Sequence, residues 1–311
     1  MGIADDFISS FLKEYPHARS GKLSMEELND LMAGYQRKMN SSPLEDFDGL
    51  SPEQMTVLLH APFAPGGLLQ FRKGMDTYLD QIPLFKLSEM LLNEIQNSGN
   101  LKLTVKGNLP VRVCELLCSQ NLIKWEFMKY IKRIREEEIP YLWPLKQYLL
   151  DQGIIKKRNN TLSLTGNGKK FMEEPKAIRF TQLFTFFTNR FHWGNFYGLQ
   201  DDGKCGRLGW AYSLVLLSKY GNEARESEFY SVKLIRAFEK ELWEIHQAGK
   251  KGKAIEDQHR AYAARFFECF AYWFGLVNIE RKRDYSISYF DQLTITKSVL
   301  FDQLFEVELI K

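Results

Sequence analysis

The residues whose types and spacing could do chemistry are concentrated in one short segment. Residues 153–171 read GIIKKRNNTLSLTGNGKKF. A cation that neutralises a phosphate releases a bound counterion, so a local cluster of Lys and Arg can contact a nucleic-acid backbone. The residues predicted to bind nucleic acid are the cations of this segment and the two asparagines between them: Lys156, Lys157, Arg158, Asn159, Asn160, Lys169 and Lys170. The alternative is a solvated hairpin whose charges only protect an edge strand from aggregation.

A second segment has the spacing of a phosphate-binding loop. Residues 198–205 read GLQDDGKC, but Cys205 stands where a serine or threonine hydroxyl would hold magnesium. Asp201 and Asp202 would also place two carboxylates inside the anion cradle. The sequence therefore favours a surface turn here.

The histidines and cysteines give little support for catalysis or metal binding. His192, His246 and His259 match no known motif, and they could act as acid or base only if the fold gathers them with carboxylates. Cys114 and Cys118 lie on one predicted helix face, but no nearby histidine or cysteine completes a tetrahedral metal site. We expect no metal and no cofactor, and an enzyme of unknown class is the third hypothesis.

Composition describes an ordered globular chain. The 311 residues are 44% hydrophobic and 26% charged, and they are long enough for two or three domains. The net charge of +3 is too small to indicate nucleic-acid binding by itself, because a basic patch must be local. Scattered cysteines, acidic residues near the start and no long apolar run predict a cytoplasmic protein without a membrane span.

Residues 153–171 also predict a strand, a two-residue Asn-Asn turn, a second strand and a helix start. In a winged-helix domain such a hairpin follows the third helix and forms the wing. Helices are expected near residues 24–40, 51–60, 83–95, 208–220, 235–245 and 262–273, from capping residues and apolar periodicity. The predicted fold class is mainly α with short antiparallel β-hairpins, with winged-helix-like units inside a multi-helix protein.

An internal repeat extends this pattern. LSLTGNGKKF at 162–171 is echoed by LTITKSVLFD at 293–302, and each follows a glycine that closes an apolar helix, Gly153 and Gly275. The glycine after the strand is missing from the second copy, where Ser298 stands. We predict an N-terminal helical region (1–98), a winged-helix-like domain (99–175) and a C-terminal helical domain (176–311) that ends in a second possible winged-helix-like unit.

The residues before the predicted hairpin bear on the choice between nucleic-acid binding and protein interaction. A predicted basic helix face is followed at once by Glu136, Glu137 and Glu138, which would repel phosphate. The next helix is apolar and contains two prolines, which suits burial or a protein interface better than a DNA major groove. An exposed apolar interaction surface is predicted around Trp143 and Tyr148. The cations of the predicted basic face are Lys124, Lys129, Lys132, Arg133 and Arg135.

Several phrases resemble those of an uncharacterised bacterial protein family with winged-helix-like repeats. The resemblance spans most of residues 50–280 and implies no catalytic residues; the first hairpin also resembles the wings of many bacterial transcriptional regulators. The phrases are LSPEQMTVLLHAPF, DQIPLF, LKLTVKGNLPVRV, GIIKKRNNTLSLTGNGKKF and FFECFAYWFGLV.

The leading hypothesis is a non-enzymatic regulator or adaptor whose winged-helix-like units bind nucleic acid. The runner-up uses the same units as a protein interaction scaffold. The sequence leaves the partner and the oligomeric state open.

Overall fold

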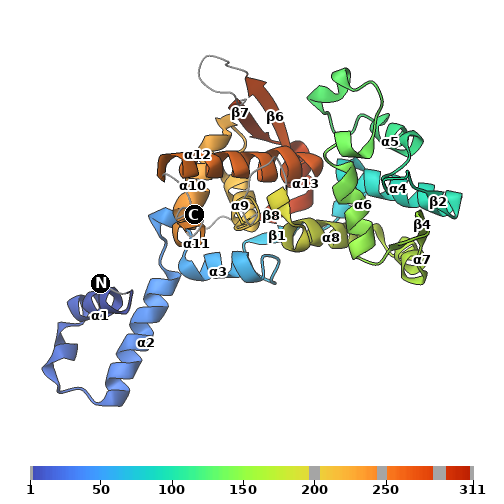
Figure 1. Cartoon of the computed structure of the whole chain (residues 1–311). Helices are drawn as coiled ribbons and strands as arrows, with labels where there is room; N and C mark the ends of the chain where they lie inside the picture. The colour runs from blue at the N-terminus through green and yellow to red at the C-terminus, as the bar shows by residue number, and fades with distance from the viewer. Residues whose placement is uncertain (1–2, 196–203, 244–250, 283–291, 309–311) are drawn as a thin grey trace.

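The protein is mainly helical, with 61% of its residues in helices and a few short strands in small antiparallel sheets (Figure 1). This computed structural model describes residues 3–195, 204–243, 251–282 and 292–308. In the described part the strands form a two-stranded sheet, β1-β8, and two three-stranded sheets, β2-β4-β3 and β5-β7-β6. The predicted fold class is thereby confirmed at the level of helices and hairpins.

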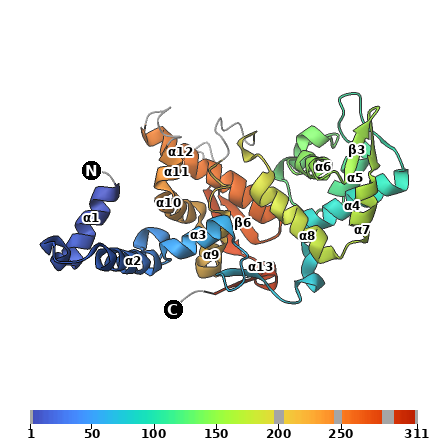
Figure 2. The same ribbon diagram turned by 90° about the horizontal axis from the view of Figure 1, so that it is seen from below.

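The first two helices stand apart from the rest of the molecule (Figures 1 and 2). Helices α1 (Ile3–Glu14) and α2 (Met25–Ser41) pack through a small aromatic cluster in which Phe11 contacts Tyr35, with ring centroids 5.6 Å apart. The predicted capping box at Ser24 is present and starts α2. Helix α3 (Pro52–His60) begins with a second capping box, at Ser51, and connects this hairpin to the body.

Residues 83–173 form a compact group that we call unit 1. Helix α4 packs against β2, β4 and α5, and the strands pair in the order β2-β4-β3. The elements of unit 1 are α4 (Pro83–Ser98), β2 (Leu101–Lys102), α5 (Val111–Cys118), α6 (Leu142–Asp151), β3 (Ile155–Arg158), β4 (Thr161–Leu164) and α7 (Gly166–Glu173). We call the β3-β4 pair the first hairpin.

Residues 210–304, which we call unit 2, follow the same order with one additional short helix, Glu239–Trp243. Its three strands pair as β5-β7-β6, so the first strand again lies beside the third. We call the β6-β7 pair the second hairpin. The elements of unit 2 are α9 (Trp210–Tyr220), β5 (Arg225–Glu226), α10 (Ser227–Ala237), α11 (Glu239–Trp243), α12 (Lys251–Tyr262), η9 (Ala263–Ala271), β6 (Val277–Lys282), β7 (Gln292–Lys297) and α13 (Val299–Leu304). The π-helix η9 continues directly from α12.

The two hairpins are closed by equivalent hydrogen bonds. Gly153 and Gly275 have left-handed backbone, with φ of 64° and 71°, which glycine adopts without steric cost. The Thr165 hydroxyl donates to the Gly153 carbonyl (2.7 Å), and the Ser298 hydroxyl donates to the Gly275 carbonyl (2.6 Å). Thr165 and Ser298 also cap the helices that follow. Ser298 is thus the counterpart of Thr165, rather than of the glycine that follows that strand.

Helix α8 (Lys176–Thr185) joins the two units through an aromatic core. The ring of Phe184 lies within 6.1 Å, centroid to centroid, of rings from the N-terminal region, α8 itself, unit 2 and the strand after unit 2: Phe63, Phe71, Phe180, Trp210, Phe270, Phe274 and Phe305. Strand β1 (Leu69–Phe71) also pairs with β8 (Phe305–Val307). One continuous hydrophobic core therefore includes residues from all three regions predicted from the sequence.

One predicted helix is shorter than expected. The apolar spacing over residues 235–245 suggested a single helix, but α10 ends at Ala237 and α11 starts at Glu239. Phe238 breaks the helix, with φ of −123° and ψ of 31°, while its ring is buried. Tertiary packing of that ring therefore overrides the local helical period. Ile245, the last apolar position of that pattern, lies outside the described residues.

A network around Asp48 attaches the segment before α3 to unit 2. The carboxylate of Asp48 accepts hydrogen bonds from Lys219 (2.8 Å), Lys233 and Tyr220 (2.8 Å). Burial pushes the pKa of Asp48 upward, but these three donors together hold it below its ordinary value. The ionised carboxylate therefore contributes to folding above the unfolded-state pKa, and this contribution is lost as the pH falls through the lowered folded-state pKa.

We expect Asp48→Asn to lower the free energy of unfolding at neutral pH, and the difference from the wild type to shrink as the pH falls below about 4. Urea unfolding of both proteins from pH 7 downward measures this. Asp46→Asn, at an exposed neighbouring position, is the control and should change little at any pH. A difference for Asp48→Asn that stays constant with pH would contradict the role of the charge.

We expect Gly168→Ala to destabilise the protein by about 1–3 kcal/mol, because its Cβ would overlap the carbonyl oxygen of Ile154 and push α7 away from the first hairpin. Gly166→Ala in the same helix turn is the matched control, since nothing lies within 4 Å of its Cβ. That control should be neutral or stabilising. Urea midpoints of the two variants compare the effects, and equal midpoints would refute the close contact.

Candidate nucleic-acid interface

The first hairpin has the predicted turn. Asn159 and Asn160 both have positive φ, 49° and 55°, as a two-residue type I′ connection requires. The register pairs Arg158 with Thr161 and Lys156 with Ser163. Directly paired residues point to the same side of a sheet, so these four side chains share one face.

A further cation joins this face from a strand that the sequence analysis did not connect to the hairpin. Lys102 of β2 pairs with Thr161 of β4, so it lies in the same row as Arg158. We call Lys102, Lys156 and Arg158, with the hydroxyl side chains of Thr161 and Ser163, the outer face. All three cations are exposed, and the three strands contain no Asp or Glu. Only the pairing of β2 with β4 brings Lys102 here, and sequence spacing carries no sign of it.

Two of the predicted binding residues, Lys157 and Asn160, are not part of the outer face. Lys157 pairs with the buried Leu162 and so lies on the opposite face, where its amine is beside Gly107. The side-chain amide of Asn160 donates to the carbonyl oxygens of Leu103 (3.3 Å) and Thr104 (2.8 Å). Asn160 therefore ties the hairpin tip to the turn after β2, while Asn159 remains exposed at the tip.

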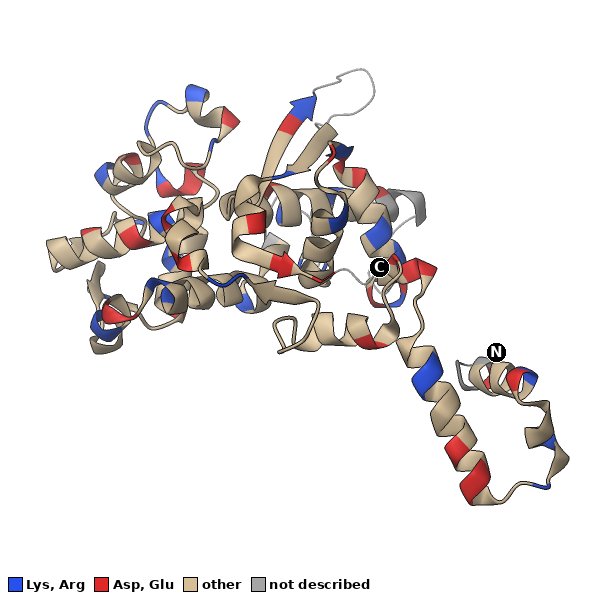
Figure 3. Cartoon of the chain, turned by 180° about the vertical axis from the view of Figure 1, so that it is seen from behind, with Lys and Arg blue, Asp and Glu red and all other residues tan. Residues whose placement is uncertain are grey.

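Lys169 and Lys170 lie at the other end of the hairpin. Both are exposed on α7, which begins where β4 ends. The strand length puts the hairpin base roughly 10 Å from the tip. The predicted cluster is therefore spread over two sheet faces and a helix, with Lys156 and Arg158 together on one of them. Figure 3 shows that both signs of charge occur over most of the protein, so the absence of acidic residues from these strands is a local property.

The helix before the first hairpin presents few groups to a ligand. In α6 the intermediate or exposed positions are Trp143, Gln147, Leu150 and Asp151, and Gln147 donates to Asp151 (2.6 Å). Trp143 is 40% exposed, as predicted for an interaction surface. Tyr148 is fully buried against Phe186, so its assignment to that surface was wrong. The helix period places Tyr148 toward the core, and burial raises the pKa of its hydroxyl.

A buried ion pair fixes α6 to the rest of unit 1. The Lys146 amine lies 2.5 Å from the Glu136 carboxylate, and both side chains are almost fully buried. Glu136 also accepts from the backbone amide of Leu109 (2.5 Å), and Lys146 donates to the carbonyl of Gly107 (3.2 Å). The pair thus satisfies two loop backbone groups that would otherwise be buried without partners. It also turns one of the three consecutive glutamates inward.

The residues considered for catalysis do not assemble a site in the described structure. His192 is exposed, and His246 lies outside the described residues. His259 is 2.5 Å from the hydroxyl of the buried Ser231, and burial lowers the pKa of His259. Among the described residues no group of three His, Cys, Asp or Glu could hold a metal ion. Of residues 198–205, which have phosphate-loop spacing and were predicted to form a surface turn, only Lys204 and Cys205 are described, and Cys205 is buried.

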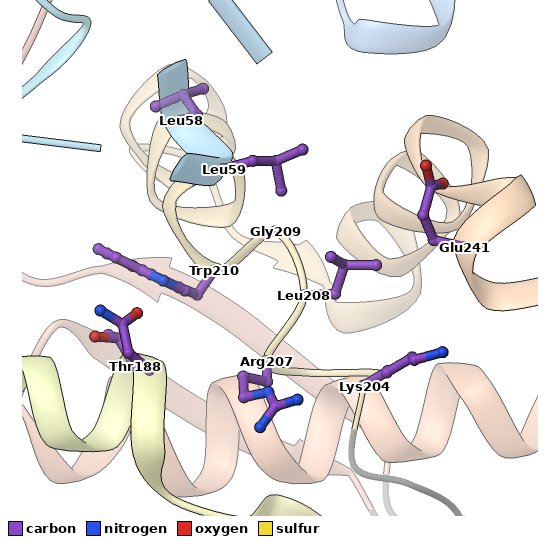
Figure 4. Close-up of a pocket in the computed structure, with 10 residues that line it drawn as sticks. Leu58, Leu59, Thr188, Lys204, Arg207, Leu208, Gly209, Trp210 and Glu241 are labelled. Atoms are coloured by element: carbon purple, nitrogen blue, oxygen red, sulfur yellow. The ribbon is translucent and has the colours of Figure 1, made fainter. Parts of the chain in front are cut away.

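A pocket of about 560 Å³ lies between α3, η6 (Phe186–Arg190) and the start of α9 (Figure 4). Its charged lining consists of Lys204, Arg207 and Glu241, and its apolar lining includes Leu58 and Trp210. Among the described residues that line it there is no histidine or cysteine. None of His192, His246 and His259 is among the described residues that line it, so this pocket does not gather the histidines that the enzyme hypothesis names.

The chain matches no protein-family model, no curated protein and no solved structure. None of the described helices is both long and apolar enough to cross a bilayer. The resemblance noted in the sequence stays a prediction.

We expect Lys146→Met to destabilise the protein by about 3–5 kcal/mol, because Glu136 would keep a buried, unpaired charge. Adding Glu136→Gln should restore part of the loss, since glutamine removes the charge and still accepts from Leu109. Arg112→Met is the control: it breaks an ion pair with Glu94 in which the arginine is largely exposed and should cost about 1 kcal/mol or less. Urea unfolding measures all three, and a double variant less stable than Lys146→Met would contradict this account.

Proposed function

We propose that this protein is a non-enzymatic regulator or adaptor that binds nucleic acid through winged-helix-like units. Two features support the assignment of such units. In both units the hairpin follows a helix that ends at a left-handed glycine, the third helix of unit 1 and the fourth helix of unit 2, and in both the first strand pairs with the third. The two hairpins are closed by equivalent glycines and hydroxyls. The first and second hairpins would then be the wings.

The observation that carries the proposal is the composition of the outer face. Lys102 of β2 and Lys156 and Arg158 of β3 present three exposed cations from the two outer strands of the sheet, and Thr161 and Ser163 of the central strand β4 add hydroxyl groups. Adjacent strands are about 4.8 Å apart, so Lys102 and Arg158 start roughly 10 Å from each other across the sheet. Such a spread of charge can contact neighbouring phosphates, and each contact releases a counterion.

The residues near the outer face favour contacts with the nucleic-acid backbone over recognition of the base sequence. Direct readout by the helix before a wing requires exposed Arg, Asn, Gln, Ser or Thr side chains that reach base edges. Helix α6 offers only Gln147, and that side chain is hydrogen-bonded to Asp151. We therefore expect little discrimination between duplex sequences.

A protein interaction scaffold is the second candidate. Trp143 is exposed on α6, and a shallow groove of about 460 Å³ lies along α8, where Ile178 is 51% exposed. The groove lining is Gln152, Ala177, Ile178, Thr181, Gln182, Thr185, Phe186 and Arg190. This surface is distinct from the outer face, so substitutions there should leave nucleic-acid binding unchanged.

We expect Lys156→Gln/Arg158→Gln to weaken binding to a short DNA duplex and to reduce the slope of log K against log salt by about 2, one unit for each lost phosphate contact. Fluorescence anisotropy with a labelled duplex at several salt concentrations measures the slope. The reduction should be the same for unrelated duplex sequences.

The matched control is Lys13→Gln/Lys22→Gln, which removes two exposed lysines from the N-terminal hairpin. It changes net charge equally and should leave the slope unchanged. Equal effects of the two double variants would mean that only overall charge matters. Salt-independent binding, or no binding by the wild type, would refute the role of the outer face.

A further inference from the structure

The segment between α5 and α6, residues 119–138, which we call the connector, differs from its sequence-based prediction. A basic helix face was expected here, but the connector consists of two short 3-10 turns, η4 (Glu126–Tyr130) and η5 (Glu136–Glu138), and irregular backbone. Its apolar side chains recur every third residue and pack on the core: Trp125, Met128, Ile131 and Ile134. This threefold period fits 3-10 winding and turns the intervening residues outward.

The outward residues are cations and aromatic rings. Tyr130 is 69% exposed and Phe127 is 47% exposed. Four cations alternate with them and are also exposed: Lys124, Lys129, Lys132 and Arg133. None of these four is in an ion pair with another described residue. The Lys129 amine lies 5.0 Å from the centroid of the Tyr130 ring, so charge and ring are neighbours.

The fold removes one carboxylate of the acidic run, which was expected to repel phosphate, from the surface. Glu136 is buried and pairs with Lys146. Glu137 accepts from the side-chain amide of Asn108 (2.7 Å), and Glu138 accepts from the backbone amide of Arg135 (3.3 Å). The glutamates are thus used to close turns, one of them deep in the core. Five exposed cations of the connector therefore outnumber its three exposed carboxylates, those of Glu126, Glu137 and Glu138.

The connector also forms a pocket with the second hairpin. A space of about 520 Å³ is lined by Lys124, Trp125, Glu126 and Lys129 of the connector and by Arg281 of β6. The Arg281 guanidinium lies 3.4 Å from the Glu126 carboxylate. Lys124, Lys129 and Arg281 therefore lie around the Glu126 carboxylate and one partly exposed indole ring, and the Arg281 guanidinium also pairs with Glu268. The volume is sufficient for a nucleotide base, and the charges suit its phosphate.

We propose that the connector and this pocket bind single-stranded nucleic acid, with unpaired bases stacked on Tyr130 and Trp125 and the backbone held by Lys124 and Lys129. Exposed rings interleaved with cations are the combination that sequence-tolerant single-strand binding uses, because every base has a face that can stack. The proposal extends the proposed nucleic-acid function to a second surface and a different form of the ligand. An acidic peptide could bind the same cations, but its binding would not depend on the aromatic rings.

The test is binding of a labelled oligothymidylate of about 15 nucleotides, measured by anisotropy at several salt concentrations. We expect Tyr130→Ala to weaken binding at least about fivefold, as expected for one lost stacked base. Lys124→Gln/Lys129→Gln should reduce the salt slope by about 1.4. Lys13→Gln/Lys22→Gln is again the matched control and should behave as the wild type. All five positions are exposed, and urea midpoints check that each variant is folded.

The outcomes separate this proposal from the role of the outer face. We expect Lys156→Gln/Arg158→Gln to impair duplex binding and to spare oligothymidylate, and the connector variants to do the reverse. If the duplex is not bound but oligothymidylate is, with the expected variant effects, the outer-face proposal fails and this one stands. No binding of oligothymidylate, unchanged binding by both connector variants, or equal competition by polyglutamate of the same charge would overturn it.

Discussion

Both units depend on one backbone constraint, the closure of each hairpin onto the helix before it. A left-handed glycine ends the helix, and a threonine or serine hydroxyl at the far end of the hairpin donates to that glycine's carbonyl. The same hydroxyl accepts from the helix that follows. Helix, hairpin and next helix are thus fixed at one point. Any residue other than glycine would adopt the required φ only with strain.

The aromatic core then fixes one unit against the other. Phe184 on α8 contacts rings from before unit 1 and from unit 2, and Gly275 lies against Pro83, the first residue of α4. Close-packed aromatic interiors deform little. The connector of unit 1 therefore meets β6 of unit 2 in a defined way, and their shared pocket exists only because of this packing.

Burial of the Glu136 carboxylate changes the balance of charge on the surface of the connector. Lys146 draws Glu136 into the core, where the carboxylate also satisfies the amide of Leu109. An isolated buried charge would be costly, so the lysine and the glutamate are interdependent. The neighbouring cations Lys132 and Arg133 stay in water. The connector, which contains five cations and four glutamates, thereby exposes five cations and three carboxylates.

The sequence by itself determined the local structure: the caps at Ser24 and Ser51, the Asn159-Asn160 turn, both hairpins and the mainly helical class all follow from short-range backbone preferences. It also indicated the repeat, through Gly153 and Gly275. Only the tertiary structure decided which side chains share a surface. Strand pairing brought Lys102 to the same face as Arg158, across β4, and put Lys157 on the opposite face. Packing buried Tyr148 and broke the helix at Phe238. Contacts between residues distant in the chain carry no local signal, because they depend on how whole elements dock.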